Sequence, residues 1–166
     1  MFAYDYSMKK LIISILLWLL VAGWIAFIFS MSAQPAELSD KVSKGALEKI
    51  YEVSHEDTDS TYEQKSEDFI EINHSTIRRA AHFVMFMVLA ILVSVASLYS
   101  FNKPVIRFSV PVIVSVIYPF VDELFQLTVP GRAFEWNDVG LDILGGILGC
   151  AFVYLIYFAS GKLNNK

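Results

Sequence analysis

Hydrophobic residues along the chain gather into four long runs that polar segments separate. The first run, Leu11 to Phe29, has 19 residues and meets the ~20 that a helix needs to cross the hydrocarbon core of a bilayer. Three further runs cover about Ala80 to Ser100, Val105 to Val121 and Val139 to Ala159. The pattern predicts an all-α integral membrane protein, built as a bundle of four transmembrane helices.

Two features of these runs leave alternatives. Lys9 and Lys10 precede the first run, which suits either a membrane anchor or a secretory signal peptide. Because the run is longer than the ~7–15 apolar residues of a signal-peptide core, we interpret it as a transmembrane helix. Pro111 and Pro119 fall inside the third run, so a kink or an early end of that helix is expected.

The segment between the first two runs, residues 30–77, is polar and acidic. It holds eleven acidic residues and four lysines, a net charge of −7. Apolar residues recur in it at spacings of three and four, which predicts an amphipathic helix that lies on the membrane surface or caps the bundle. These residues are Leu38, Val42, Ala46, Ile50 and Val53. The segment from Ser54 to Lys65 has few apolar residues and many acidic ones, so we expect a mobile loop there. We expect Ser75 to be the N-cap of a helix that enters the second run.

Composition agrees with a membrane protein of one domain, residues 1–166. Hydrophobic residues make up 55% of the 166 positions and charged residues only 18%. A net charge of −4 gives no support to nucleic-acid binding. The single cysteine, Cys150, excludes an intrachain disulfide and is interpreted as a small packing residue because it lies in an apolar run. The sequence contains no P-loop and no GxGxxG motif, so no cofactor is predicted.

The distribution of basic residues predicts the orientation in the membrane. Lysine and arginine are enriched in short cytoplasmic segments. With four spans and both termini in the cytoplasm, six basic residues lie on the inner face. They are Lys9, Lys10, Lys103, Arg107, Lys162 and Lys166. The acidic segment and the loop from Asp122 to Asp138 then face away from the cytoplasm.

Nine polar residues beside the apolar runs are the candidate site. An ionisable group at membrane depth is costly unless it is paired or functional. The i,i+4 spacing of Asp122 with Gln126, and of Asp138 with Asp142, places each pair on one helix face. In the expected topology, all nine residues converge at the outer edge of the bilayer. They are Arg78, Arg79, His82, Asp122, Glu123, Gln126, Arg132, Asp138 and Asp142.

Three interpretations of this cluster remain open. Positive and negative groups nearly balance, and guanidinium binds carboxylate bidentately, so a purely structural ion-pair network is one of them. A ligand site is another, because arginines bind lipid phosphates and substrate carboxylates. Its candidate residues are Arg78, Arg79, Gln126, Arg132, Asp138 and Asp142. The third is an enzyme on a lipid-linked substrate, in which His82 and either Asp122 or Glu123 are the catalytic acid and base. A metal site is disfavoured because no HExxH-type pair is present.

The last polar segment and the fourth run also carry two packing signals. Gly145 and Gly149 form a GxxxG pattern, which predicts the close approach of a neighbouring helix. The Pro130-Gly131-Arg132 sequence predicts a tight turn. We expect that turn to fold the acidic residues back toward the arginines and His82.

Three stretches carry an ordered pattern of polar residues. They are FSMSAQPAELSDKVS (Phe29 to Ser43), IRRAAHFVMF (Ile77 to Phe86) and the stretch Asp122 to Gly149, which contains Asp-Glu-x-x-Gln, Pro-Gly-Arg and Asp-x-x-x-Asp. Together they resemble the VanZ-like membrane protein family, named for a protein associated with teicoplanin resistance. The resemblance extends from the first apolar run to the last.

This resemblance implies a multi-pass protein of the bacterial cell membrane, linked in some members to reduced susceptibility to glycopeptide antibiotics. It places the family's polar positions on the same nine residues. Phe86 stands where the family usually has a tyrosine, so a role for that hydroxyl is absent here. The expected partners are the lipid bilayer and, at the outer leaflet, a glycopeptide or a lipid-linked cell-wall precursor. The family implies no settled reaction, so an enzyme and a non-catalytic scaffold stay as alternatives.

Overall fold

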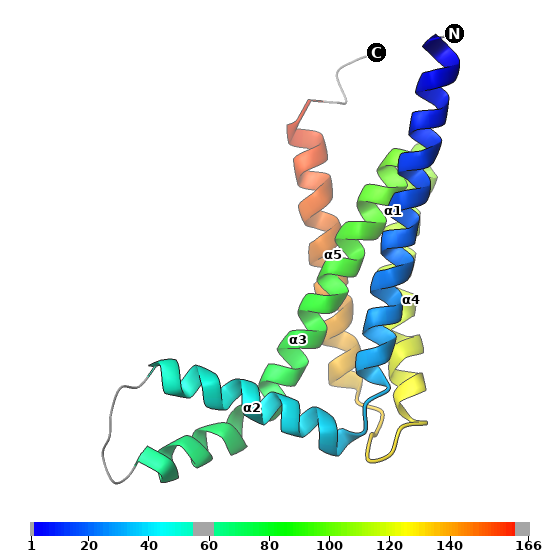
Figure 1. The fold of residues 1–166 in the computed structure, drawn as a ribbon. Helices are drawn as coiled ribbons and strands as arrows, with labels where there is room; N and C mark the ends of the chain where they lie inside the picture. The colour runs from blue at the N-terminus through cyan, green and yellow to red at the C-terminus, as the bar shows by residue number, and fades with distance from the viewer. Residues whose placement is uncertain (1, 55–61, 162–166) are drawn as a thin grey trace.

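The described part of the chain consists of α-helices joined by short connections. The computed structural model describes residues 2–54 and 62–161, which contain five helices and no strand. These are α1 (Phe2–Ser32), α2 (Ala36–Ser54), α3 (Tyr62–Ser100), α4 (Pro104–Gln126) and α5 (Trp136–Ala159). Figure 1 shows α1, α3, α4 and α5 running along a common direction, with α2 lying across them at one end.

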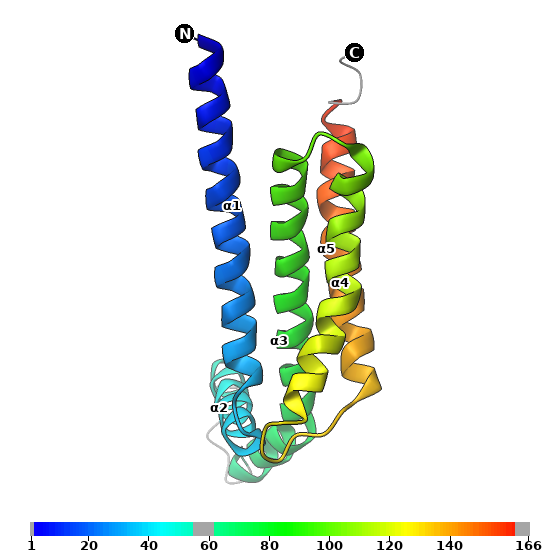
Figure 2. The same ribbon diagram turned by 90° about the vertical axis from the view of Figure 1, so that its right-hand side faces the viewer.

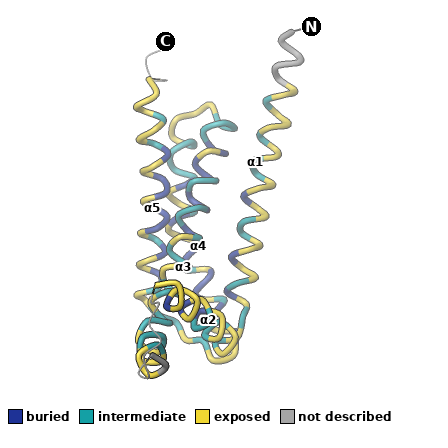
Figure 3. The backbone as a smooth tube through the Cα atoms, turned by 60° about the vertical axis from the view of Figure 1, so that its left-hand side comes forward, coloured by how far each residue is buried: buried dark blue, intermediate teal, exposed yellow. Residues whose placement is uncertain are grey.

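Four of the helices are long and apolar enough to cross a membrane, which confirms the prediction. The segments that meet this criterion are Met8–Ser32, Gln64–Ser100, Pro104–Gln126 and Trp136–Ala159. Large apolar side chains face outward from the bundle, such as Leu155 with 69% of its surface exposed. Exposed and buried positions alternate along each of these helices (Figure 3). An apolar outer surface of this kind suits contact with lipid.

Helix α3 forms the centre of the bundle. Its residues Phe86, Leu89, Val93 and Ala96 are almost completely buried and pack against Val21 and Ile28 of α1. On its other side α3 packs against α4 and α5, which run beside it in Figure 2. The first turn of α1 and the last turn of α5 lie at one end of the bundle, and α2 lies at the other (Figure 1).

The glycines of α5 allow close contact with its neighbours, as the GxxxG pattern predicts. A Cβ at Gly145 would collide with the backbone carbonyl of Phe83, and one at Gly149 with that of Met87. Gly146 faces α4, where a Cβ would lie 2.7 Å from the Cβ of Ser115. Helix α5 is therefore held against the backbone of α3 at a distance that no larger residue permits.

Helix α4 continues through both of its internal prolines. It begins at Pro104, where the missing N–H of proline costs no helical hydrogen bond, and ends at Gln126. The expected early end near Pro111 or Pro119 was therefore wrong. Both prolines are buried, so packing by the neighbouring helices compensates for the bonds that they remove.

The segment between α1 and the membrane-crossing part of α3 also differs from expectation. Helix α3 runs without interruption past Ser75, so this serine is no N-cap. The predicted loop at 54–65 falls mainly on residues 55–61, which lie outside the described residues, while α3 already begins at Tyr62. The polar sequence from Tyr62 to Thr76 is thus the first part of one 39-residue helix.

Helix α2 is the expected amphipathic helix, but a different face of it packs on the protein. The buried residues are Ser43, Leu47 and Tyr51, and the Tyr51 ring lies 5.4 Å from that of Phe69 on α3, measured between centroids. The predicted apolar stripe is exposed instead, with Val42 at 53% and Val53 at 86%. Residues one position apart are separated by about 100° around a helix, so the apolar face is wide and only half of it meets α3.

The close contact of Gly145 and Gly149 with the α3 backbone, called the glycine seam from here on, leads to a stability prediction. We expect Gly149→Ala to destabilise the protein by about 1–3 kcal/mol, because the added methyl overpacks the contact with α3. Gly140→Ala is the matched control on the same helix, since nothing lies within 4 Å of a Cβ there. Alanine is favoured over glycine in helices, so the control should melt at the same temperature or higher. Equal melting of the two variants in detergent would contradict the seam.

Candidate functional site

The nine candidate residues all lie toward the end of the bundle where α2 crosses it. Asp122, Glu123 and Gln126 are in the last turns of α4, and Asp138 and Asp142 are in the first turns of α5. Arg132 lies in the connection between these helices. Arg78, Arg79 and His82 lie on α3, close to α2. The opposite end, which carries the first turn of α1 and the last turn of α5, has none of these residues (Figure 1).

A buried hydrogen-bond network joins α1 to α4. The Ser32 hydroxyl donates to Oδ2 of Asp122 over 2.8 Å, and Nε2 of Gln126 donates to the same oxygen over 3.1 Å. Gln126 also donates to Oε2 of Glu123 over 3.3 Å. Asp122 is only 2% exposed, and its Oδ1 has no hydrogen-bond partner within the described residues. A buried polar network of this kind fixes the relative position of its helices while its members remain paired.

Glu123 also holds the beginning of α5. The backbone N–H of Glu135 donates to Oε1 of Glu123 over 2.7 Å. Glu135 is the N-cap residue of α5, and its own side chain makes no capping bond. The amide groups at a helix start lack partners within the helix, so the α4 carboxylate supplies one from outside.

The two neighbouring arginines of α3 bind acidic groups on different helices. Nε of Arg79 lies 2.8 Å from Oδ1 of Asp138, and Nη2 of the same guanidinium pairs with Glu135. Nη1 of Arg78 lies 2.7 Å from Oδ1 of Asp40 on α2. The first pair of contacts ties α3 to α5, and the second ties α3 to α2.

Two residues of this network, Asp40 and Glu135, escaped the sequence reasoning, whereas Ser32 was expected at this edge because it follows the first run. Asp40 belongs to the polar stretch after that run, and Glu135 lies between two aromatic residues. One signal was available for Glu135, because it stands three positions before Asp138 at the start of a helix, on the same face. Asp40 offered no such signal, since its contact with Arg78 depends on how α2 folds back over α3.

The imidazole of His82 lies beside Asp142, with Nδ1 at 3.9 Å from Oδ2. Within the described residues, no contact of this kind within 4.0 Å joins His82 to Asp122 or Glu123. Acid–base work by His82 with one of those two residues therefore stays a prediction. Asp142 is 3% exposed. A carboxylate behind one ring nitrogen orients the imidazole and leaves the other nitrogen for a ligand.

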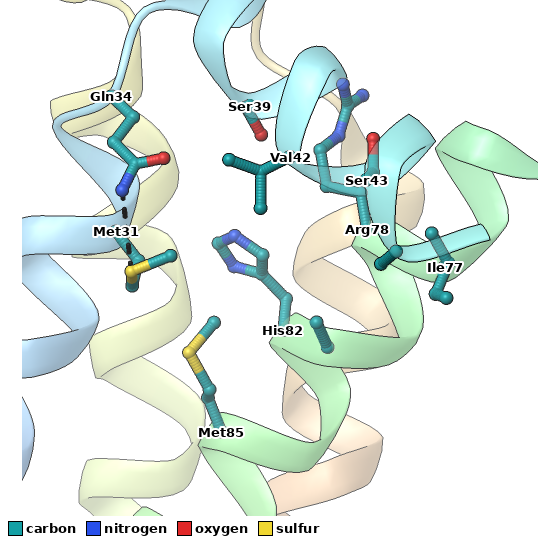
Figure 4. A pocket seen from close by; sticks show the side chains of 11 residues that line it. Met31, Gln34, Ser39, Val42, Ser43, Ile77, Arg78, His82 and Met85 are labelled. Atoms are coloured by element: carbon teal, nitrogen blue, oxygen red, sulfur yellow. Dashed lines mark hydrogen bonds between the residues drawn. The ribbon is translucent and has the colours of Figure 1, made fainter. Parts of the chain in front are cut away.

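His82 lines a pocket between the end of α1, the underside of α2 and the adjacent face of α3. Figure 4 shows its ring between Met31 of α1, Val42 of α2 and Met85 one turn further along α3. The pocket has an empty volume of about 550 Å³, which includes space open to solvent. Its polar margin comes from Gln34 and Arg78, and the remaining walls are mostly apolar. This combination is typical of small-molecule sites.

Arg132 lies beside that pocket with no carboxylate partner. Its Nε and Nη2 each lie 3.5 Å from the backbone oxygen of Gln34, and no ion pair within 4.0 Å involves it in the described part of the chain. Burial, and then the nearby charge of Arg78, lower the pKa of Arg132 from its ordinary value. An arginine still remains a cation at neutral pH. Gly131, with φ of +76°, makes the predicted turn that places it there.

The arrangement supports anion binding and proton exchange, and it also holds helices together. Among the residues that the structure covers, no group of three or more His, Cys, Asp or Glu side chains is placed to hold a metal ion. The guanidinium of Arg132 is available to an anion, while those of Arg78 and Arg79 already bind carboxylates. The imidazole of His82 and the carboxylate of Asp142 are the pair placed at the pocket wall.

The buried network generates a second stability prediction. We expect Ser32→Ala to cost about 1–3 kcal/mol, because it removes a hydrogen bond to a buried carboxylate. Ser30→Ala on the same helix is the control, since the exposed Ser30 hydroxyl bonds only the Phe27 carbonyl of its own helix. Thermal melting in detergent should separate the two variants. Identical melting temperatures would show that Ser32 does not stabilise the Asp122 site.

Comparison with known proteins agrees with the motifs and the helix arrangement. The VanZ/LLP1 family matches residues 17–157, from the first membrane-crossing helix to the last. No curated protein and no solved structure gives a significant match to the chain. The family match covers most of the 166 residues and includes every candidate site residue. The chain therefore belongs to the VanZ/LLP1 family, as a membrane protein with several spanning helices.

Proposed function

We propose that this protein works in the bacterial cell envelope and lowers susceptibility to teicoplanin-type glycopeptides by binding a cell-surface ligand at the outer membrane–water boundary. The observation that carries the proposal is the gathering of nine polar residues at one end of the bundle, beside a pocket. Such a concentration of charge at membrane depth is costly. A ligand site explains why Arg132 makes no ion pair with the described residues and why His82 lines a pocket, whereas helix packing alone explains neither.

The proposed orientation places this end outside and both termini in the cytoplasm. The support is the distribution of basic residues. The end without the site carries Lys9, Lys10, Lys103 and Arg107, and Lys162 and Lys166 follow α5 in the sequence. Clustered lysine in short segments marks the cytoplasmic face. The acidic α2 region then faces the cell wall.

A second candidate function is an enzyme that acts on a lipid-linked envelope substrate. The observation that favours it is the contact of His82 with Asp142 at the wall of the pocket. A histidine backed by a carboxylate is suited to general acid–base work. In this version Asp142 orients His82, while Asp122 and Glu123 stay in the network that positions α4 and α5. Asp142→Asn would then abolish turnover while melting stays unchanged.

A third candidate is a scaffold without chemistry of its own. The bonds of Ser32 to Asp122 and of the Glu135 backbone to Glu123 support it, because the first joins α1 to α4 and the second joins α4 to the start of α5. In that case every substitution in the cluster would lower the melting temperature. A variant that melts normally but loses function would exclude the scaffold as the whole explanation.

The resistance role generates a direct prediction. Expression in a susceptible bacterial host should raise teicoplanin tolerance relative to the empty vector, and His82→Ala or Asp122→Asn should remove the gain. His74→Ala is the matched control on the same helix, because His74 does not line the pocket. Tolerance is measured as the minimum inhibitory concentration, and membrane accumulation of each variant is measured in parallel. No difference between vector and wild type would remove the role.

The orientation generates a separate prediction. A cysteine at Glu52, an exposed position of α2, should react in intact cells with a maleimide that cannot cross the membrane. Cys150 is buried and should give little background. Labelling that occurs only after lysis would place α2 in the cytoplasm and reverse the topology.

A further inference from the structure

The pocket beneath α2 has the shape and lining of a site for one amphiphile. Met31, Val42 and Met85 supply its apolar walls from three different helices (Figure 4). Methionine side chains are flexible and adapt to irregular apolar ligands. Met85 lies one turn deeper along α3 than His82, so the apolar part of the pocket points into the bundle and away from the water beyond α2.

The exposed stripe of α2 continues this apolar surface outward. Val42 and Ala46 line the pocket, and Ile50 and Val53 follow on the same face of the helix. Val42, Ile50 and Val53 all remain exposed. Because α2 lies across the end of a bundle whose helices are long enough to span a membrane, an exposed apolar stripe on α2 suits contact with acyl chains. The pocket continues directly into this stripe at Val42 and Ala46.

The polar margin of the pocket includes a guanidinium without a close ion pair. Arg78 pairs with Asp40, whereas the hydrogen bonds of Arg132 in the described part of the chain go to the neutral Gln34 carbonyl. Asp40, Glu123 and Asp138 act on Arg132 from beyond 4.0 Å. Gln34 itself lines the pocket, so this guanidinium lies next to the opening. His82 adds a ring nitrogen that Asp142 does not face. A half-buried arginine with a histidine nearby complements a phosphate, which guanidinium binds through two parallel hydrogen bonds.

We propose that this pocket binds a phosphate-headed lipid from the outer leaflet, with the phosphate between Arg132 and His82 and the first methylenes between Met31, Val42 and Met85. This inference rests on the proposed function of this end as a ligand-binding surface, and it names the class of ligand. The cavity volume of about 140 Å³ takes the phosphate and the first methylenes, and the headgroup beyond the phosphate reaches the open side of the pocket. The remainder of the tail follows the apolar stripe of α2 into the bilayer.

The phosphate has two sources in such a membrane, a phospholipid and a polyprenyl phosphate that carries cell-wall intermediates. Purified protein in a neutral maltoside detergent is titrated with phosphatidic acid, with undecaprenyl phosphate and with diacylglycerol, and binding is followed by native mass spectrometry. We expect at least one of the two phosphates to bind more than about tenfold tighter than diacylglycerol, since charged hydrogen bonds contribute about 1.5–3 kcal/mol. The tighter of the two identifies the source.

Variants separate this pocket from general lipid contact. Val42→Trp fills the pocket and should weaken phosphate-lipid binding about tenfold or more, a loss that corresponds to at least about 1.4 kcal/mol. Val105→Trp is the matched control, because Val105 is an exposed valine at the start of α4, at the opposite end of the bundle, and lies neither in the pocket nor on the stripe of α2. Arg132→Gln should remove the preference for phosphate over diacylglycerol. Ala46→Trp replaces Val42→Trp if that variant fails to accumulate.

Two results would overturn the inference. Diacylglycerol binding as tightly as both phosphates would remove the phosphate site, and equal binding by the Val42 and Val105 variants would place the lipid elsewhere. The measurement is independent of antibiotic tolerance. Lipid binding that Val42→Trp abolishes, in a protein that does not change teicoplanin tolerance, would therefore sustain this inference and reject the proposed function.

Discussion

The cost of burying carboxylates at membrane depth is the constraint on which the rest of this structure depends. Asp122, Glu123 and Asp142 are all at most 3% exposed. Each needs partners, because an isolated buried charge in a low-dielectric environment costs several kcal/mol or more. Gln126 is a partner on α4 itself, but Ser32, the Glu135 backbone and His82 belong to other elements, so these contacts require α1, α3, α4 and the start of α5 to meet at one place. The electrostatic requirement of the buried carboxylates therefore constrains how the helices are arranged.

The glycine seam helps to meet this requirement, because it positions Asp142 relative to α3. Gly145 follows Asp142 by three residues, so it lies one turn away on the same side of α5. The contact of Gly145 with the Phe83 backbone brings this turn of α5 against α3, and His82 is the residue before Phe83. The distance between Asp142 and His82 is thus set by backbone packing one turn away. A larger residue in the seam would separate the pair even though it touches neither member.

The four spans and the candidate residues could be predicted because both are local signals. A run of about 20 apolar residues has few alternatives, and charges beside such runs stand out. The partner of each polar residue was harder to predict. The ion pair of Arg78 with Asp40 and the contact of His82 with Asp142 depend on how α2 and α5 pack on α3. The uninterrupted α3 escaped because its polar first turns carry no apolar period. The buried face of α2 escaped because its apolar surface is wider than the face that α3 covers.

The length of α3 has a mechanical consequence. Its 39 residues extend over about 58 Å at 1.5 Å per residue, roughly twice the ~30 Å hydrocarbon core. The part beyond the core carries α2, which is attached through Leu47, Tyr51 and the Arg78–Asp40 pair. Because one helix contains both parts, a tilt of α3 as a rigid rod would displace α2, which covers the pocket, further than it would displace the segment within the bilayer.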